Sequence, residues 1–430
     1  MTVNDVENYI RDVQRFSTKN TPEHTMEFLR RLGNPQEKFP VIHVAGSNGK
    51  GSVCAMLSSA LINAGKKTGL FISPHLVTIL ERIEINGENC PEERFVEAFE
   101  EVKAVIDGMV SEGLPHPTFF EILFAMGMVV FAKENVDIAV LETGLGGRLD
   151  ATNIVKKPLI TVITSISLEH TEYLGDTLAK IAGEKAGIIK EGVPVVFDAK
   201  NNEVSDVIFA KALEKKAPNY PVYPGDIEVL PRRNGCVTFK FDLNNHNEPV
   251  VLPFYGEYQA ENGAIAMQAA EILAEEGLLS REDIYEGFKK TKWPGRMQKL
   301  RDNVYVDGAH NPDGIRVLVE SVKALKCKDV TLFFSMVKEK DYAHSISLLL
   351  SGINFSKIII TEIDGYRKLD ADDIAECFKE VKDRVIIERD FDKAYDMALE
   401  SAKDGTLICT GSLYLVGNIL ALEEKRNIDD

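Results

Sequence analysis

The feature that most constrains the fold is a glycine-rich turn between an apolar strand and a helix. Residues 41–45 form a short apolar run, and a helical pattern extends from Val53 to Ala64. Glycines in such a turn let the backbone approach an anion, toward which successive N–H groups and the helix N-terminus point. The segment therefore predicts a site for the phosphates of a nucleoside triphosphate.

The same turn carries a lysine and a hydroxyl that suit this role. Lys50 can bring positive charge to the phosphates, and Ser52 can bind the metal ion that accompanies ATP. The strict Walker pattern G-x-x-x-x-G-K-[ST] is not matched, because a glycine separates these two residues. An ordinary glycine-rich strand-to-helix turn stays open as the alternative. The predicted nucleotide-binding residues are Gly46, Ser47, Asn48, Gly49, Lys50, Gly51 and Ser52.

Strands and helices alternate through most of the first 200 residues. Short apolar runs indicate strands at 41–45, 67–72, 136–141, 159–165 and 193–197. Helical patterns lie at 4–32, 53–64, 92–112, 119–134, 176–190, 260–276 and 281–290. This alternation predicts a parallel sheet with helices on both faces. Residues 222–254 break the alternation and predict a small antiparallel hairpin set.

A second alternating set follows the segment Trp293-Pro294-Gly295-Arg296, which we interpret as a hinge. Its predicted strands are 303–307, 329–335, 357–362, 384–388 and 406–410, and its predicted helices are 312–326, 341–351, 371–382, 391–402 and 412–424. The 430 residues exceed the usual size of one hydrophobic core. We therefore predict two α/β domains: a P-loop-type ATPase domain over 1–295 and a Rossmann-like open domain over 296–430.

Composition excludes several classes of partner. The formal net charge of −17 argues against broad binding to nucleic acid or to an anionic membrane. The six cysteines contain no C-x-x-C pair, which is typical of reduced thiols in the cytoplasm. The charged N-terminus does not resemble a signal peptide, and we find no apolar run long enough to span a membrane. We expect a cytoplasmic monomer.

Polar side chains follow several predicted strands at their carboxyl ends: Ser73, Glu142, His170 and Asp307. Ligands of open α/β sheets bind at that edge. Glu142 is placed like a Walker-B acid and could hold Mg²⁺. The alternatives are a solvated strand-end glutamate, a structural histidine and a turn that merely caps a helix. Lys185 lies within a predicted helix and reads by default as a solvated surface lysine.

Several segments together resemble the folylpolyglutamate synthase and dihydrofolate synthase family, within the Mur ligase superfamily. They occur in order along nearly the whole chain: 43–52, Ser73-Pro74-His75-Leu76, 142–153, 170–175, 184–190, 293–296 and 307–311. The resemblance implies that ATP phosphorylates the carboxylate of a folate or dihydropteroate. The amine of L-glutamate then attacks the acyl phosphate, which yields amide, ADP and phosphate.

The resemblance also implies roles for individual residues. Ser52, Ser73 and Glu142 match ligands of one Mg²⁺ ion, and Glu142, His170 and Lys185 match ligands of a second, with Lys185 carbamylated. A K⁺ ion is a further cofactor that it allows. Nucleotide contacts beyond the turn are Asn262, Arg296 and Asp307. The glutamate side of the site carries His310 and Ser412, and the acceptor side carries Thr118, Phe119, Phe120 and Glu121. Independently of the resemblance, Arg148 is a candidate substrate contact, because it follows three glycines and could pair with a phosphate or a carboxylate.

Two departures from the family pattern stand out. Thr78-Ile79-Leu80 replaces the usual basic and polar or aromatic residues of a folate-contacting loop, so the preferred folate form stays open. Tyr258 stands where relatives often have histidine. Two other functions stay open as well: a Mur-type ligase with a non-folate acceptor, such as a cell-wall nucleotide peptide, and a nucleotide-binding switch without ligase chemistry.

Overall fold

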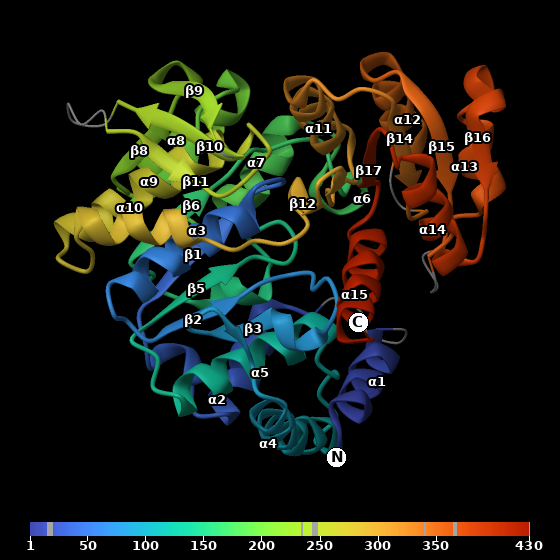
Figure 1. Ribbon diagram of the computed structural model, residues 1–430. Helices are drawn as coiled ribbons and strands as arrows, with labels where there is room; N and C mark the ends of the chain where they lie inside the picture. Colours follow the sequence, from blue (N-terminus) through green and yellow to red (C-terminus); the bar gives the residue numbers. More distant parts are fainter. Residues whose placement is uncertain (15–19, 234, 243–247, 339–340, 364–367, 430) are drawn as a thin grey trace. The chain divides into compact units, whose positions relative to one another are not determined.

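The computed structural model describes residues 1–14, 20–233, 235–242, 248–338, 341–363 and 368–429 (Figure 1). The chain divides into two compact units. The first contains Met1–Leu230, Thr238–Leu252 and Ala260–Lys292, and the second contains Pro231–Val237, Pro253–Gln259 and Trp293–Asp430. The main division thus falls beside the predicted hinge, while two short earlier segments join the second unit.

The first unit is built on an eight-stranded sheet with the order β4-β3-β2-β5-β1-β6-β7-β8. From β2 to β8 neighbouring strands are parallel, as predicted, whereas β3 and β4 add an antiparallel edge. The strands are β1 (Val41–Ala45), β2 (Thr68–Phe71), β3 (Ile83–Ile85), β4 (Glu88–Asn89), β5 (Ile138–Glu142), β6 (Ile160–Ile163), β7 (Val195–Asp198) and β8 (Asn219–Val222).

Helices cover both faces of this sheet. Figure 1 shows α3 and α10 on one face and α2, α4 and α5 on the other. The helices are α1 (Val3–Gln14), α2 (Pro22–Arg31), α3 (Lys50–Asn63), α4 (Glu92–Ser111), α5 (Phe119–Lys133), α6 (Thr171–Leu174), α7 (Leu178–Ala186), α8 (Asn202–Glu214), α9 (Gln259–Glu275) and α10 (Arg281–Lys290). Short 3₁₀ turns are η1 (Pro35–Glu37), η2 (Ile79–Arg82), η3 (Ala151–Ile154) and η4 (Pro224–Asp226).

The predicted hairpin region forms a separate three-stranded sheet with the order β11-β10-β9. Its strands are β9 (Ile227–Arg233), β10 (Cys236–Phe241) and β11 (Val250–Leu252). Residues on β10 alternate between buried and half-buried positions. That period of two is typical of a strand with one face on a core.

The second unit has a six-stranded sheet with the order β12-β13-β17-β14-β15-β16. All neighbouring pairs are parallel except β12 with β13. The strands are β12 (Gln298–Arg301), β13 (Val304–Val306), β14 (Val330–Phe334), β15 (Phe355–Ile360), β16 (Val385–Ile387) and β17 (Thr406–Thr410). The helices are α11 (Pro312–Leu325), α12 (Tyr342–Gly352), α13 (Ala371–Glu376), α14 (Phe391–Ser401) and α15 (Leu413–Asp429).

One predicted helix of the second unit is wrong in its extent. The pattern over 371–382 predicts a single helix, but α13 ends at Glu376 and the 3₁₀ segment η5 (Lys379–Arg384) follows. Phe378, between them, is fully buried and packs edge-on against Phe334 with ring centroids 5.9 Å apart. Val381 has a non-helical φ of −126°. Tertiary packing therefore interrupts a helical period that the local pattern continues.

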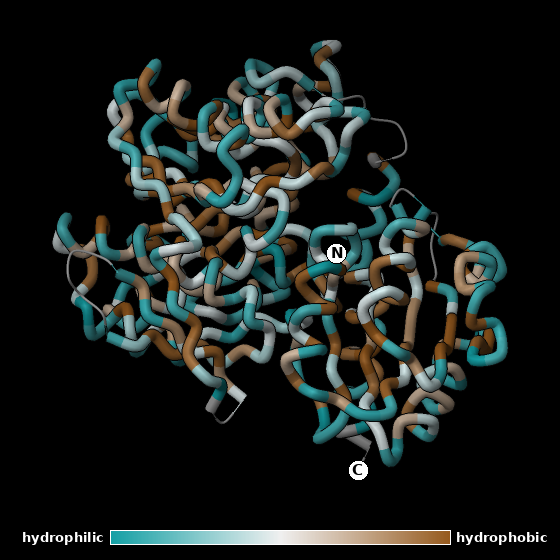
Figure 2. The backbone as a smooth tube through the Cα atoms, turned by 90° about the horizontal axis from the view of Figure 1, so that it is seen from above, coloured by the Kyte–Doolittle hydropathy of each residue, from teal (hydrophilic) through white to brown (hydrophobic). Residues whose placement is uncertain are grey.

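Apolar side chains form an interior in each unit. Figure 2 shows the hydrophobic segments running mainly through the inside, with hydrophilic turns around them. Every residue of β1 is buried, so the strand that leads into the glycine-rich turn is anchored on both faces. Among the described residues, no helix is both long and apolar enough to cross a membrane.

Candidate nucleotide and ligase site

The glycine-rich turn after β1 leaves no room for side chains at two positions. Gly46 has φ +153°, and a Cβ there would lie 1.8 Å from Thr164 Oγ1. Gly49 has φ +89°, and a Cβ there would lie 2.2 Å from Asn262 Oδ1. Both positions therefore require glycine, one for close packing and one also for its left-handed backbone. Asn262, assigned to the nucleotide by resemblance, lies directly beside the turn.

Helix α3 begins immediately after the turn, with Gly49 at its N-cap and no side-chain cap bond. The N-terminus of a helix attracts anions when no side chain covers it. Lys50 bends back over the turn, and its Nζ donates to the carbonyl oxygens of Gly46 at 3.0 Å and Ser47 at 3.1 Å. Ser52 lies buried in the first turn of the helix. The local geometry matches a phosphate-binding turn.

Glu142 lies at the end of β5, beside the same turn. β5 pairs with β1, and Glu142 is opposite Val44 in that pairing. The buried carboxylate accepts a hydrogen bond from the backbone N–H of Ser73 at 3.0 Å, and its Oε1 lies 4.0 Å from Lys50 Nζ. The sequence-based expectation that Ser73, Glu142 and the turn meet at one sheet edge is confirmed.

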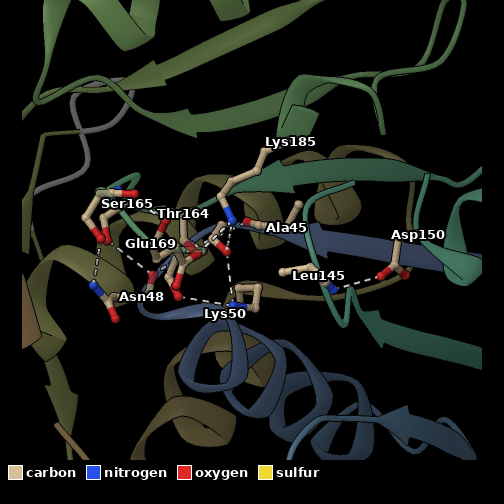
Figure 3. Close-up of polar contacts among 12 residues, drawn as sticks. Ala45, Asn48, Lys50, Leu145, Asp150, Thr164, Ser165, Glu169 and Lys185 are labelled. Atoms are coloured by element: carbon tan, nitrogen blue, oxygen red, sulfur yellow. Dashed lines mark hydrogen bonds and ion pairs between the residues drawn. The ribbon is translucent and has the colours of Figure 1, made fainter. Parts of the chain in front are cut away.

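Lys185 is buried, which contradicts its default reading as a surface lysine. Only 1% of the residue is exposed. Its Nζ donates to Gly46 O at 2.7 Å and to Glu169 Oε1 at 3.0 Å (Figure 3). Burial lowers the pKa of Lys185 to about 8, although Glu169 opposes that shift. Burial by itself would raise the pKa of Glu169, but Lys185 and then Lys50 bring it to about 2.

His170 lies one residue beyond Glu169 and is exposed. It adopts a left-handed backbone with φ 48° and forms the N-cap of α6. The part of the chain that the structure describes contains no cluster of three or more His, Cys, Asp or Glu side chains arranged for a metal ion. That finding does not bear on Glu142, His170 and Lys185 as a set, because Lys185 contributes an ammonium group, which pairs here with Glu169.

The second glycine-rich segment, after β5, is held by its own aspartate. Asp150 accepts hydrogen bonds from Leu145 N at 2.8 Å and from the Thr152 hydroxyl at 2.6 Å. The same hydroxyl lies 2.8 Å from His43 Nε2. Arg148 points outward and pairs with Glu184 at 2.8 Å. Its guanidinium therefore already has a carboxylate partner on α7.

The predicted acceptor segment forms the start of α5. Thr118 caps the helix, and the side chains of Thr118 and Glu121 form a reciprocal capping box. The guanidinium of Arg82 lies 5.3 Å from the ring centroid of Phe119. The ring of Phe120 lies against Phe71, with centroids 5.7 Å apart. The two phenylalanines are half-buried, and Glu121 is buried.

The remaining predicted residues belong to the second unit, around the turn after β13. The buried Asp307 accepts hydrogen bonds from Tyr258 Oη at 2.8 Å, Met297 N at 2.7 Å and Ala309 N at 2.8 Å. Burial raises the pKa of Asp307 against the influence of a neighbouring arginine. His310 Nδ1 lies 2.7 Å from Gly308 O.

Two other predicted residues of this unit make local contacts. Arg296 Nη1 donates to Gly295 O at 3.1 Å. Ser412 is buried, and its hydroxyl accepts from Tyr414 N at 3.1 Å at the start of α15. These residues gather around the β13 and β17 ends of one sheet. Their approach to the nucleotide turn of the first unit stays a prediction.

Sequence reasoning missed two contributors to the site. Glu169 was not among the predicted site residues, yet it is the ion-pair partner of Lys185. Thr164 entered only as part of a strand, yet its hydroxyl donates to Asn48 O at 2.7 Å and lines Gly46. An acid directly before a histidine at a strand end was the available signal for Glu169. Thr164 gave no local signal, because its role comes from the pairing of β6 with β1.

Comparison with known proteins agrees with this geometry. Residues 44–270 match the Mur ligase middle domain, and residues 295–413 match the Mur ligase, glutamate ligase domain. The dihydrofolate synthase/folylpolyglutamate synthase of Bacillus subtilis (strain 168) is 34% identical over 432 residues, which covers 96% of this chain and 97% of that protein.

Two solved structures are also similar over almost the full chain. Mycobacterium tuberculosis folylpolyglutamate synthase complexed with ADP has a TM-score of 0.87 and 30% identity, and covers 98% of each chain. A structure described as an FPGS-AMPPCP-folate complex has a TM-score of 0.85 and 30% identity, and covers 97% of this chain and 98% of the other. The chain belongs to the folylpolyglutamate synthase and dihydrofolate synthase family of Mur ligases.

Proposed function

We propose that this protein is an ATP-dependent ligase that joins L-glutamate to the carboxylate of a folate or dihydropteroate. The observation that carries the proposal is the turn Gly46–Ser52, with Lys50 and the buried Glu142 at the same sheet edge. The family membership and the relatives' complexes with ADP and with AMPPCP and folate support it.

The first chemical step is phosphoryl transfer. An oxygen of the acceptor carboxylate attacks the γ-phosphorus of ATP, and the bond to the bridging oxygen breaks, which leaves ADP. An anion attacking a polyanion is opposed by charge repulsion, so positioning and charge neutralisation supply most of the catalysis. Lys50 and the N-terminus of α3 provide positive potential beside the phosphates. The amine of L-glutamate then attacks the acyl carbon, and phosphate leaves as the amide forms.

Two sets of residues could bind Mg²⁺, and only the first offers oxygen ligands without a chemical modification. Ser52, Ser73 and Glu142 lie at one edge and offer oxygen atoms, which Mg²⁺ prefers. Bound there, the ion would neutralise phosphate charge. Glu142, His170 and Lys185 fit a second ion only if Lys185 is carbamylated, because an ammonium group cannot act as a ligand. Burial and the low pKa of Lys185 favour reaction of its neutral amine with CO₂.

The other predicted residues divide between three roles. Asn262, Arg296 and Asp307 would contact the nucleotide beyond its phosphates. His310 and Ser412 would face the incoming glutamate. Arg148 and the segment 118–121 would face the acceptor, where an aromatic ring can stack on the pterin. Two Mg²⁺ sites, a K⁺ ion, a cytoplasmic location and a monomeric state complete the proposal.

Glutamate incorporation tests the proposed function. The purified protein is incubated with ATP, Mg²⁺ and labelled L-glutamate, with dihydropteroate and tetrahydrofolate as acceptors in parallel. We expect label in an amide product. Phosphate release should require both L-glutamate and an acceptor. Release without any acceptor would favour a nucleotide switch, and incorporation only with a cell-wall nucleotide peptide would favour another Mur-type ligase.

A further inference from the structure

The carboxylate of Glu121 is buried at the start of α5 and is fully engaged by protein donors. Only 5% of the residue is exposed. Oε1 accepts from the Thr25 hydroxyl at 2.6 Å. Oε2 accepts from Asn20 Nδ2 at 2.8 Å and from the Thr118 backbone N–H at 2.7 Å. Burying a carboxylate is costly unless hydrogen bonds replace its water. Three donors here fulfil that condition.

These bonds connect two segments that are distant in the sequence, residues 20–25 and residues 115–121. Asn20 lies just before α2 and Thr25 lies within it, whereas Glu121 belongs to α5. Asn20 Nδ2 also lies 3.1 Å from His116 O, and His24 Nε2 lies 2.7 Å from Pro115 O. Since a carbonyl oxygen only accepts, His24 Nε2 carries the proton in that contact. We call the set Asn20, Thr25, Thr118 and Glu121 the α2–α5 clamp.

The clamp lies directly beside the two aromatic residues of the acceptor segment. Phe119 packs under the guanidinium of Arg82 at 5.3 Å. Phe120 fits closely against Gly144, where an added Cβ would lie 2.6 Å from the phenyl Cζ. Both residues sit in the first turn of α5, between Thr118 and Glu121. A shift of this turn would therefore move both rings.

We infer that Glu121 is a positioning residue for the acceptor, rather than a group that binds the acceptor itself. Its oxygens hold the first turn of α5 against α2, and this contact places Phe119 and Phe120. The inference rests on the proposed function, because it takes these two rings as part of the acceptor pocket. It refines the sequence-based expectation, which assigned Glu121 to the substrate.

Two pairs of variants separate positioning from direct contact. In Glu121→Gln the amide oxygen can accept from Asn20 and Thr118, and its NH₂ can donate to Thr25 once that hydroxyl turns round. Glu121→Ala removes the clamp. Thr25→Val removes one donor without changing shape, and Thr25→Ser restores a hydroxyl. Glu112→Gln is the control, because Glu112 ties α2 to the end of α4 through an exposed pair with Arg31 at 2.7 Å.

The measured quantities are the KM for the acceptor, the KM for ATP and the direct affinity for folate and dihydropteroate. We expect Glu121→Ala and Thr25→Val to raise the acceptor KM about tenfold to hundredfold, the cost of a misplaced binding group, without changing the KM for ATP. Glu121→Gln and Thr25→Ser should stay within about twofold of the wild type, because each buried partner keeps a hydrogen bond. Glu112→Gln should match the wild type.

Three results would overturn the inference. If Glu121→Gln lost as much affinity as Glu121→Ala, the carboxylate would contact the acceptor directly. If Thr25→Val left the acceptor KM unchanged, the α2–α5 clamp would not position the pocket. The comparison of Thr25→Val with Thr25→Ser remains decisive even where Glu121→Ala fails to fold. A wild-type protein that neither bound nor ligated any folate would remove the proposed function as well, which distinguishes that failure from the other two.

Discussion

The two units contain a similar strand–turn–helix segment with opposite local chemistry. In the first unit β1 leads through Gly46–Gly49 into α3, whose N-cap offers no side chain. In the second unit β13 leads into α11, whose N-cap Asn311 accepts from Gly314 N at 2.7 Å. Asp307, in that second turn, accepts from two backbone N–H groups and a tyrosine.

The comparison teaches that topology alone does not make an anion site. The second turn uses its own carboxylate and amide side chains as acceptors for nearby donors, and these hydrogen bonds fix its conformation. The first turn uses glycines, and it directs a lysine and an uncapped helix N-terminus to the same place. We therefore expect substitutions in the first turn to affect catalysis and those in the second turn to affect stability first.

We expect the strongest loss of activity from a substitution of Lys50, in the first turn. Lys50→Met removes the charge and retains most of the side-chain stem, so kcat/KM should fall about a thousandfold through lost stabilisation of phosphoryl transfer. Phosphate release in the presence of acceptor and glutamate measures this, with the exposed Lys38→Met as control. Activity close to that of the wild type would refute the assignment of the turn.

The next effect concerns Lys185, which reaches the carbonyl of Gly46 in the first turn. If Lys185 is carbamylated, removing CO₂ should lower kcat about hundredfold, and added bicarbonate should restore it. Lys185→Ala should show the same loss without recovery in bicarbonate. A wild-type rate that ignores CO₂, together with an active Lys185→Ala variant, would leave this lysine a purely structural role.

Asp307→Ala tests the structural role of the second turn. It leaves Tyr258 Oη and two backbone N–H groups without their acceptor, so the free energy of unfolding should fall by about 3 kcal/mol. Urea denaturation measures the change. Asp302→Ala provides the control, since its fully exposed carboxylate pairs only at the surface with Lys299. Equal stability of the two variants would contradict a structural role for this turn.

We expect the smallest effect from Glu84, a half-buried acid away from both turns. Burial, followed by Glu81 and Glu88, raises the pKa of Glu84 to about 7 from 4.5. Between these values the folded state binds more protons than the unfolded state, so this group makes stability fall as pH rises through that window. Glu84→Gln should therefore stabilise the protein by about 1 to 2 kcal/mol at pH 8 and by nothing below pH 4.

Thermal unfolding of Glu84→Gln and of wild type at both pH values measures this difference, and kcat should stay unchanged. Glu100→Gln is the control, because Glu100 is exposed and is not among the groups that raise the pKa of Glu84. A stabilisation that persists unchanged at low pH would show that packing rather than charge is the cause.

Sequence patterns predicted the two α/β units, most strands and the tight glycine-rich turn after β1, because periodicity and glycine spacing are local properties. They did not predict the antiparallel edge of the first sheet, although Asn86-Gly87 between β3 and β4 is a strong hairpin signal. The prediction of one helix over 371–382 was wrong, because the burial of Phe378 outweighed the helical pattern of that segment.

Site contacts that depend on tertiary neighbours were harder to predict. The burial of Lys185 and its pairing with Glu169 arise where α7 meets the loop after β6, and neither residue shows this in its own segment. The same holds for Tyr258, which departs from the family pattern and whose hydroxyl bonds to Asp307. The Gly46 and Glu142 positions were predictable because strand ends of a parallel sheet share one edge.

One isotope experiment tests whether the reaction passes through an acyl phosphate. An acceptor labelled with ¹⁸O in its carboxylate is turned over with ATP and L-glutamate, and the inorganic phosphate is analysed by mass. An acyl phosphate requires one carboxylate oxygen to leave with the phosphate, so we predict one ¹⁸O atom in each phosphate released. Unlabelled phosphate alongside normal amide formation would exclude an acyl phosphate intermediate.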